Sequence, residues 1–134
     1  MTARDAVVID TSVIVALLLD EPDSQALLAR AMSYDRRVTS TATWPESAMV
    51  CESKKPIGGE FFDQLVVQLR LQSLPFTAEQ ALLAREAFKK YGKGRQTKAS
   101  LSFGDCFAHA LAADLGAPLL FKGNDFAQTE IEPA

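Results

Sequence analysis

The sequence predicts an α/β fold with a parallel central sheet, and two features of its apolar pattern carry that prediction. Residues 6–9 and 119–121 are short, continuous apolar runs, which are typical of strands buried on both faces. Longer segments whose apolar residues recur at helical spacing separate these runs along the chain. Because helices that alternate with short buried strands pack on the faces of a parallel sheet, we expect an α/β sandwich.

The boundaries of the elements follow from polar and hydroxyl residues. Two hydroxyl residues after the first strand offer an N-cap to an apolar helix. Thr43 and Glu46 have the spacing of a capping box, and Ser102 and Asp105 form a second cap-like helix start. In chain order we expect strand 6–9, helix 13–19, helix 25–32, strand 37–40, helix 43–53, helix 60–72, a strand or connector at 74–76, a helix from 77, a helix from 102, strand 119–121 and an edge strand at Ile131.

The length of 134 residues favours one domain over 1–134, large enough to bury a core without metals or disulfides. We expect no secretory signal and no membrane span, because Asp10 interrupts the first apolar run and the run at 13–19 is far too short. Cys51 and Cys106 lie far apart without a metal-ligand pattern. A cytoplasmic, reduced chain with structural cysteines is therefore expected.

Acidic residues stand at strand ends and at helix starts. Strand carboxyl ends and the amino ends of the following helices lie on the same edge of a parallel sheet, so these acids are expected to meet. Such a cluster is unfavourable unless a cation neutralises it or one acid holds a proton. With oxygen ligands alone, Mg²⁺ or Mn²⁺ is the expected ion, and its chemistry suits attack on a phosphate. The four acids are Asp10, Glu46, Asp105 and Asp125.

Each acid also has a structural alternative. Glu46 and Asp105 sit where a capping acid belongs, and Asp125 lies in a Gly-Asn-Asp sequence that is typical of a turn. Asp10 is the hardest to explain structurally, because an acid that ends a buried strand is unfavourable without a partner. The four together favour a site.

Neighbouring polar residues leave further alternatives open. Thr11 or Ser12 either contacts a water on the metal or only caps the helix. His109 shares a helix face with Asp105, but a histidine with a structural role is the more common case.

Basic residues gather in one short stretch although the net charge is −3. The stretch is either a solvated turn or a contact for the phosphate backbone of a nucleic acid, and two glycines and Tyr91 favour the contact. The glycine spacing does not match a P-loop, so ATP use has no support. The cluster comprises Lys89, Lys90, Lys93, Arg95 and Lys98, of which Lys93, Arg95 and Lys98 are the expected RNA-binding residues.

Five short motifs follow one another along almost the whole chain. They are Val-Ile-Asp-Thr-Ser at 8–12, Glu46 at a helix start, Tyr-Gly-Lys-Gly-Arg at 91–95, Phe-Gly-Asp-Cys-Phe-Ala at 103–108 and Phe-Lys-Gly-Asn-Asp-Phe at 121–126. In order and spacing they resemble the PIN domain and, more narrowly, the VapC toxins of bacterial type II toxin–antitoxin modules. Residues 96–98 and Ser102 depart from the pattern of close relatives, which often have His-Pro-Ala and Asn there.

The resemblance implies a three-layer α/β/α sandwich with a short, mainly parallel sheet. It implies a Mg²⁺- or Mn²⁺-dependent endoribonuclease that forms a homodimer and is held inactive by a VapB-type antitoxin. Asp10 and Asp105 would then be the principal metal ligands and Glu46 the third acid. The position of the family's fourth acid corresponds to Asn124 or Asp125, and the resemblance leaves that choice open. Thr11, Ser12 and Asn124 would support the site.

Two other function classes remain to be weighed against the toxin. A PIN-like module that binds RNA or a partner without cutting would show degenerate acids, and only position 124 departs in that way. A phosphohydrolase of the haloacid dehalogenase type also begins with a strand that ends in Asp, but Ser12 stands where it needs a second aspartate. The apolar helices at 13–19 and 61–71 would offer an antitoxin segment an exposed groove, unless both faces are covered within the monomer.

Overall fold

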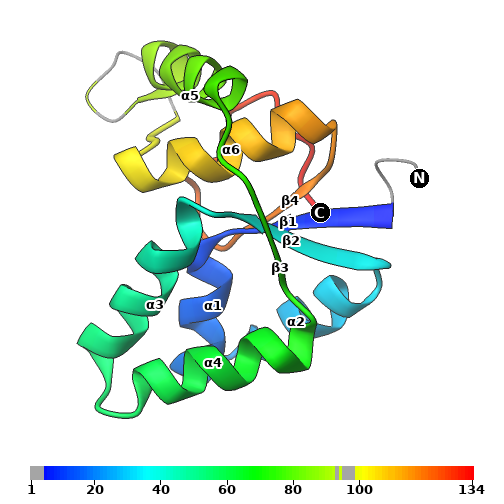
Figure 1. Ribbon diagram of the computed structural model, residues 1–134, viewed down its shortest axis with the longest axis vertical. Helices are drawn as coiled ribbons and strands as arrows, with labels where there is room; N and C mark the ends of the chain where they lie inside the picture. The colour runs from blue at the N-terminus through cyan, green and yellow to red at the C-terminus, as the bar shows by residue number, and fades with distance from the viewer. Residues whose placement is uncertain (1–4, 93, 95–98) are drawn as a thin grey trace.

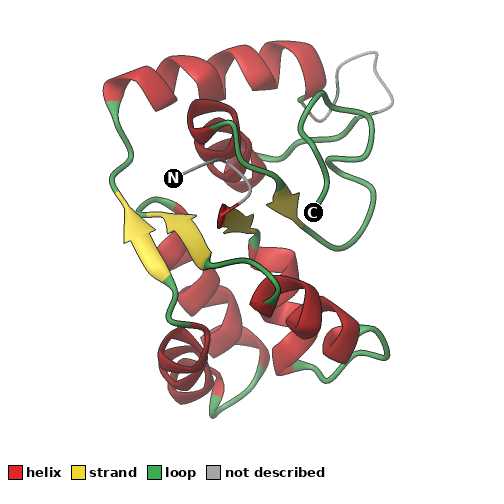
Figure 2. Cartoon of the chain, turned by 90° about the vertical axis from the view of Figure 1, so that its right-hand side faces the viewer, coloured by secondary structure: helices red, strands yellow, loops and turns green. Residues whose placement is uncertain are grey.

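The computed structural model describes residues 5–92, 94 and 99–134, which form three layers (Figure 1). The middle layer is a four-stranded sheet in the order β3-β2-β1-β4, and every pairing in it is parallel. Figure 2 shows the strands lying between the two layers of helices. The strands are β1 (Ala6–Ile9), β2 (Arg36–Ser40), β3 (Gln72–Leu74) and β4 (Leu119–Leu120).

Helices cover both faces of the sheet and bury one core on each. On one face, α1 to α4 pack around Val7, Ile9 and Leu120, and on the other α5 and α6 pack around Val8 and Leu119. The alternating direction of side chains along a strand therefore feeds both cores. The helices are α1 (Thr11–Leu18), α2 (Ser24–Met32), α3 (Thr43–Lys54), α4 (Gly58–Leu69), α5 (Ala78–Tyr91) and α6 (Phe103–Leu115). The expected α/β/α sandwich is confirmed.

The strand order reverses between β1 and β4. The chain runs outward from β1 through β2 to β3, and then crosses the sheet to place β4 on the other side of β1. Ligand sites in open parallel sheets lie outside the carboxyl ends of the strands at such a reversal. Asp10 follows the last residue of β1 and stands at this point.

Two expected boundaries were wrong near the third strand. The helix expected at 60–72 begins at Gly58 and ends at Leu69, because Arg70 adopts a left-handed conformation with φ 49°. The residues after it pair with β2, so the strand lies at 72–74 instead of 74–76. No strand forms at Ile131 in the described part of the chain, where Leu119 instead bridges to Pro133.

Helix caps also differ from the sequence expectation at two places. Asp10 itself is the N-cap of α1, and its side chain accepts the N–H of Ser12. Helix α3 begins at Thr43, whose preceding residue makes no side-chain cap, so the expected Thr43–Glu46 capping box was wrong. The second cap is confirmed, since Ser102 and Asp105 form a reciprocal capping box at the start of α6.

The helices expected to expose an apolar groove are covered only in part. Most apolar residues of α1 are buried, whereas Val67 on α4 is 76% exposed. A half-buried set joins the two helices to α2 and comprises Leu17, Leu27, Leu28, Phe61 and Val66. Within the described residues no helix is long and apolar enough to span a membrane. Cys51 and Cys106 are both free and buried.

Candidate active site

Asp10 is a buried acid whose orientation is fixed by Ser12. Its side chain lies at the carboxyl end of β1, where the residue is only 5% exposed. The N–H of Ser12 (3.0 Å) and its hydroxyl (2.6 Å) both donate to Oδ2 of Asp10. Burial raises the pKa of Asp10 despite these donors, and the charge of Glu46 raises it further. The ionised form of this carboxyl therefore needs a neutralising partner.

Glu46 approaches the site from the first turn of α3. The hydroxyl of Thr11 donates to its Oε1 at 3.0 Å, and the same hydroxyl lies 2.8 Å from Oγ of Ser47. The carboxylate lies against Gly104 in the first turn of α6, since a Cβ there would stand 1.8 Å from Oε2 of Glu46. Glu46 therefore joins α1 and α3 to the start of α6, a role different from the cap expected of it.

Asp105 serves both as a helix cap and as a member of the acid site. Its Oδ2 accepts the N–H of Ser102 at 2.9 Å, and its own N–H donates to the Ser102 hydroxyl at 3.3 Å. Its pKa is raised to about 7, first by burial and then by the charges of Asp10 and Asp125. The two readings of Asp105 left open by the sequence are thus compatible.

Asp125 lies on the exposed turn that follows β4. The turn is tied to the chain by its backbone, since the carbonyl of Asp125 accepts the N–H of Ser100 and the carbonyl of Asn124 accepts that of Ala127. Both side chains are exposed. The charge of Asp125 raises the pKa of Asp105, which indicates that this carboxylate belongs to the same electrostatic cluster.

His109 does not join the acids. It is 3% exposed, its ring lies 5.9 Å from that of Tyr91, and its Nε2 lies 3.3 Å from a carboxylate oxygen of Glu130. That separation is within ion-pair range, but the angles do not suit a hydrogen bond. Burial lowers the pKa of His109, so we regard the ring as neutral and structural.

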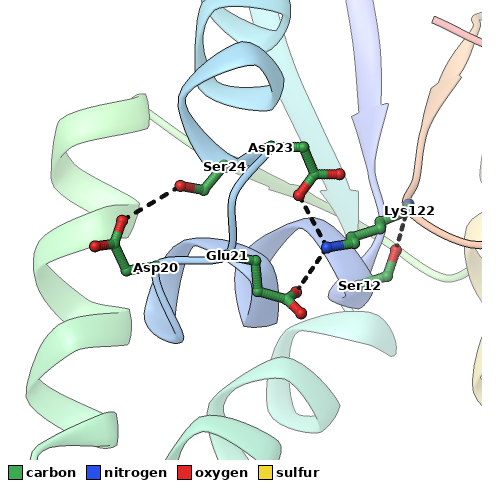
Figure 3. Close-up of polar contacts among 6 residues, drawn as sticks. All are labelled: Ser12, Asp20, Glu21, Asp23, Ser24 and Lys122. Atoms are coloured by element: carbon green, nitrogen blue, oxygen red, sulfur yellow. Dashed lines mark hydrogen bonds and ion pairs between the residues drawn. The ribbon is translucent and has the colours of Figure 1, made fainter.

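A lysine that the sequence did not single out, Lys122, contacts the Ser12 hydroxyl that binds Asp10. Figure 3 shows its contacts with Ser12, Glu21 and Asp23. The N–H of Lys122 donates to the Ser12 hydroxyl at 2.9 Å, while its ammonium contacts Glu21 and Asp23 in the turn between α1 and α2. Gly104 was missed as well, because its importance appears only in the contact with Glu46. The expected RNA-binding residues Lys93, Arg95 and Lys98 lie outside the described residues.

The acids suit a hydrated divalent ion more than a closed metal cage. In the described ranges, no three His, Cys, Asp or Glu side chains are arranged as a ready-made metal-binding group. Mg²⁺ is commonly held by one or two carboxylates, with water and substrate phosphate completing its shell. The charge of Asp10 raises the pKa of Asp105, and both side chains offer only oxygen, so the pair fits that mode of binding.

The sequence model of the PIN domain matches residues 7–132, and the chain therefore belongs to the PIN-domain family. Among curated proteins, ribonuclease VapC30 of Mycobacterium tuberculosis is 44% identical over 126 residues, which cover 92% of this chain and 95% of that protein. Ribonuclease VapC of Mycolicibacterium smegmatis is also 44% identical over 126 residues, covering 92% of this chain and 96% of that protein. Within the PIN-domain family, the chain is thus one of the VapC ribonucleases.

A solved structure supports the same fold at low sequence identity. VapC20 of Mycobacterium tuberculosis, described as a toxin that cleaves the sarcin–ricin loop, matches with a TM-score of 0.72 and 16% identity. The match covers 96% of this chain and 98% of VapC20.

Proposed function

We propose that this protein is a Mg²⁺- or Mn²⁺-dependent endoribonuclease that acts as the toxin of a toxin–antitoxin pair. The observation that carries the proposal is that Asp10 at the end of β1, Glu46 in the first turn of α3 and Asp105 in the first turn of α6 meet at one edge of the sheet, with Glu46 bonded to Thr11 and packed on Gly104. The charges of Asp10 and Asp125 raise the pKa of Asp105 there, which supports the same conclusion. Acids held together against their repulsion provide a site for a divalent cation. Similarity to curated VapC ribonucleases supports RNA as the substrate. A protein that cleaves cellular RNA would act in the cytoplasm.

The proposed mechanism gives each acid a separate task. Asp10 and Asp105 would hold the ion, and Asp125 would complete the acidic side of the site. A bound Mg²⁺ or Mn²⁺ supplies activation of water and neutralisation of charge on the phosphate. Glu46, held by Thr11, would orient the attacking water and accept its proton. As the P–O bond of the RNA breaks, solvent water would protonate the leaving oxygen. Each carboxylate except Asp125 already has a donor that fixes its direction, so little reorganisation is needed.

RNA would be held by the basic segment that follows α5. Lys93, Arg95 and Lys98 would contact backbone phosphates. Their positive charge contrasts with the acidic character of the rest of the chain. Plots of log affinity against log salt have a negative slope. Replacing all three residues by glutamine is expected to reduce the magnitude of that slope by about 2 for single-stranded RNA. A slope equal to that of the wild type would remove these residues from the RNA site.

Two protein partners are part of the proposal. A VapB-type antitoxin is supported by a solved neighbour, VapBC2 of Rickettsia felis bound to a promoter DNA fragment. That structure matches with a TM-score of 0.70 and 18% identity, and the match covers 96% of both chains. The half-buried apolar residues joining α1, α2 and α4 would take an amphipathic segment of the antitoxin.

A second copy of the chain would pack on an apolar face formed by α3, α5 and α6. Met49, Leu82 and Phe103 are 66%, 67% and 80% exposed there. Two apolar grooves of about 590 and 350 Å³ meet on this face at Phe103 and Phe107. Exposed aromatic and methionine side chains on this scale are typical of a protein interface, and a homodimer would cover them.

The deciding experiment is cleavage of a mixed cellular RNA pool by purified, antitoxin-free protein with Mg²⁺, Mn²⁺ or chelator. Asp10→Asn and Asp105→Asn are compared with Asp63→Asn, which removes an exposed acid on α4. We expect discrete, metal-dependent fragments that disappear in the first two variants and persist in the third. RNA that binds and stays intact would favour the binding-only module, and RNA that neither binds nor breaks would refute both.

A further inference from the structure

The side chain of Lys122 joins two segments that lie far apart in the sequence. Its Nζ lies 2.8 Å from Oδ1 of Asp23 and 3.2 Å from Oε1 of Glu21 (Figure 3). The first contact is a hydrogen bond that spans 99 positions of the sequence. Lys122 follows β4 and begins the turn that carries Asp125, whereas Glu21 and Asp23 belong to the turn between α1 and α2.

The turn that carries the two carboxylates has hydrogen bonds of its own. Asp20 is left-handed with φ 51°, and its N–H donates to the carbonyl of Leu17 while that of Glu21 donates to Ala16. These paired bonds are the pattern that ends a helix with a left-handed residue. Ser24, which is 2% exposed, adds a bond of 3.5 Å from its hydroxyl to the Asp20 carboxylate. Glu21 and Asp23 are therefore presented to the ammonium on a fixed backbone.

The backbone of Lys122 is tied to the acid site through Ser12. A serine hydroxyl has one proton to donate, and it accepts through its lone pairs. Here Oγ of Ser12 accepts the N–H of Lys122 at 2.9 Å and donates its proton to Oδ2 of Asp10 at 2.6 Å. The position of Lys122 thus fixes the direction in which Ser12 donates, and through it the orientation of Asp10.

We propose that Lys122 is a positioning residue for the acid site, which latches the start of the 122–125 turn onto the turn between α1 and α2. The latch sets the Ser12 hydroxyl on Asp10 and fixes where the turn toward Asp125 begins. The inference rests on the proposed function, because it assigns Lys122 a role in cation binding by these acids. Residues that hydrogen-bond a metal ligand directly commonly change metal affinity 10- to 100-fold when they are replaced. Lys122 acts one contact further out, through Ser12, so we expect an effect at the lower end of that range.

Two alternatives give different signs or different readouts. A lysine that acted only through its charge would disfavour a nearby cation, so removing it would strengthen cation binding. An ordinary exposed ion pair would contribute little to folding and nothing to cation affinity. The latch predicts weaker cation binding when the ammonium is removed, which neither alternative does.

The test measures Mn²⁺ binding to the full chain by electron paramagnetic resonance, with cleavage of RNA as a second readout. Lys122→Met is expected to weaken Mn²⁺ binding about tenfold and to raise the Mn²⁺ needed for half-maximal cleavage equally. Lys122→Arg should stay close to the wild type. Lys54→Met, at the exposed end of α3, is the matched control and should not change binding.

A charge swap separates the latch from direct contact with RNA or the ion. Lys122→Glu alone should lose Mn²⁺ affinity, and adding Asp23→Lys should restore it to within about threefold of the wild type, because the pair is rebuilt with its ends exchanged. Wild-type affinity in Lys122→Met would overturn the proposal, as would a swap that rescues nothing. A parallel fall in the urea midpoint measured in chelator would reduce Lys122 to a structural role.

Failure of the proposed function has a distinct signature. A wild-type protein that binds Mn²⁺ but cuts no RNA would end the nuclease assignment, and the Mn²⁺ comparison among variants would still decide the latch. If the wild-type protein binds no more Mn²⁺ than Asp10→Asn does, both the nuclease assignment and the latch are overturned.

Discussion

The metal-free protein should lose stability as the pH rises from about 4 to about 7, and Asp105 is the main cause. In the folded state the pKa of Asp105 is about 7, because burial and the charges of Asp10 and Asp125 oppose its ionisation. In the unfolded chain the carboxyl returns to an ordinary value near 4. The folded state therefore binds more protons between these values. The stability that this group contributes is complete below about pH 4 and is lost as the pH rises through about 7.

The structure bounds the size of the effect. The difference between a pKa of about 7 and the ordinary 3.8 corresponds to about 4 kcal/mol. The carboxyl is partly exposed, so solvent screening lowers the expected contribution to about 1–2 kcal/mol. Asp105→Asn removes the charge but keeps an oxygen that can accept the N–H of Ser102. At pH 8 in chelator this variant should be more stable than the wild type by that amount, and at pH 4 the two should be alike.

The assay is urea unfolding of both proteins in chelator from pH 4 to pH 8, with Asp63→Asn as the control for loss of an exposed acid. Comparing variants at each pH cancels the opposite contribution of His109, whose pKa is lowered in the folded state. Adding Mn²⁺ at pH 8 should stabilise the wild type more than the variant, because the ion binds the folded acids. Parallel curves for wild type and Asp105→Asn across this range would refute the reasoning. An Asn variant that is less stable at pH 8 would show that the cap outweighs the repulsion.

Three further predictions test single contacts. Gly104→Ala should lower cleavage about tenfold, because the added Cβ displaces the Glu46 carboxylate. It should not lower stability, because helix α6 tolerates alanine at this position. Unchanged cleavage would refute this contact. Arg37→Met should lower the free energy of unfolding by about 2–4 kcal/mol in urea titrations, since the buried guanidinium donates to backbone carbonyls at three sites; a change within the error of the titration would refute it. Phe103→Ser should shift the sedimenting mass from dimer toward monomer, whereas a mass equal to that of the wild type would exclude this face as the dimer contact.

The location of the acid site could be predicted from the sequence because it depends on strand ends. A continuous apolar run that stops at Asp10 marks both a buried strand and the edge at which it ends. The N-cap of the next helix could not be chosen in the same way. Asp10, Thr11 and Ser12 are three capping residues in succession, and the choice depends on where the backbone leaves the extended conformation, which is at Asp10 with ψ 155°.

Contacts between distant segments were the part that the sequence could not give. The spacing of Thr43 and Glu46 suits a cap, yet α3 begins one residue too early for that cap and Glu46 turns to Thr11 and Gly104 instead. Lys122 carries no local signal, because its partners are about a hundred residues away. A single sequence shows which residues can hold a charge, but their pairing follows from how the crossover after β3 returns the chain to β1.

The hydroxyl and backbone donors explain how a site that repels itself can persist in the folded protein. Ser12 holds Asp10, Thr11 holds Glu46 and Ser102 holds Asp105, so each carboxylate is fixed by a donor from a rigid helix start. These bonds lower the pKa of Asp10 and Asp105, although burial and mutual repulsion raise it by more. The hydrogen bonds therefore orient the acids but do not fully offset the burial and repulsion that oppose their negative charge. A divalent cation would then bind to a site that needs little rearrangement, and part of its binding energy would come from repulsion that the fold already contains.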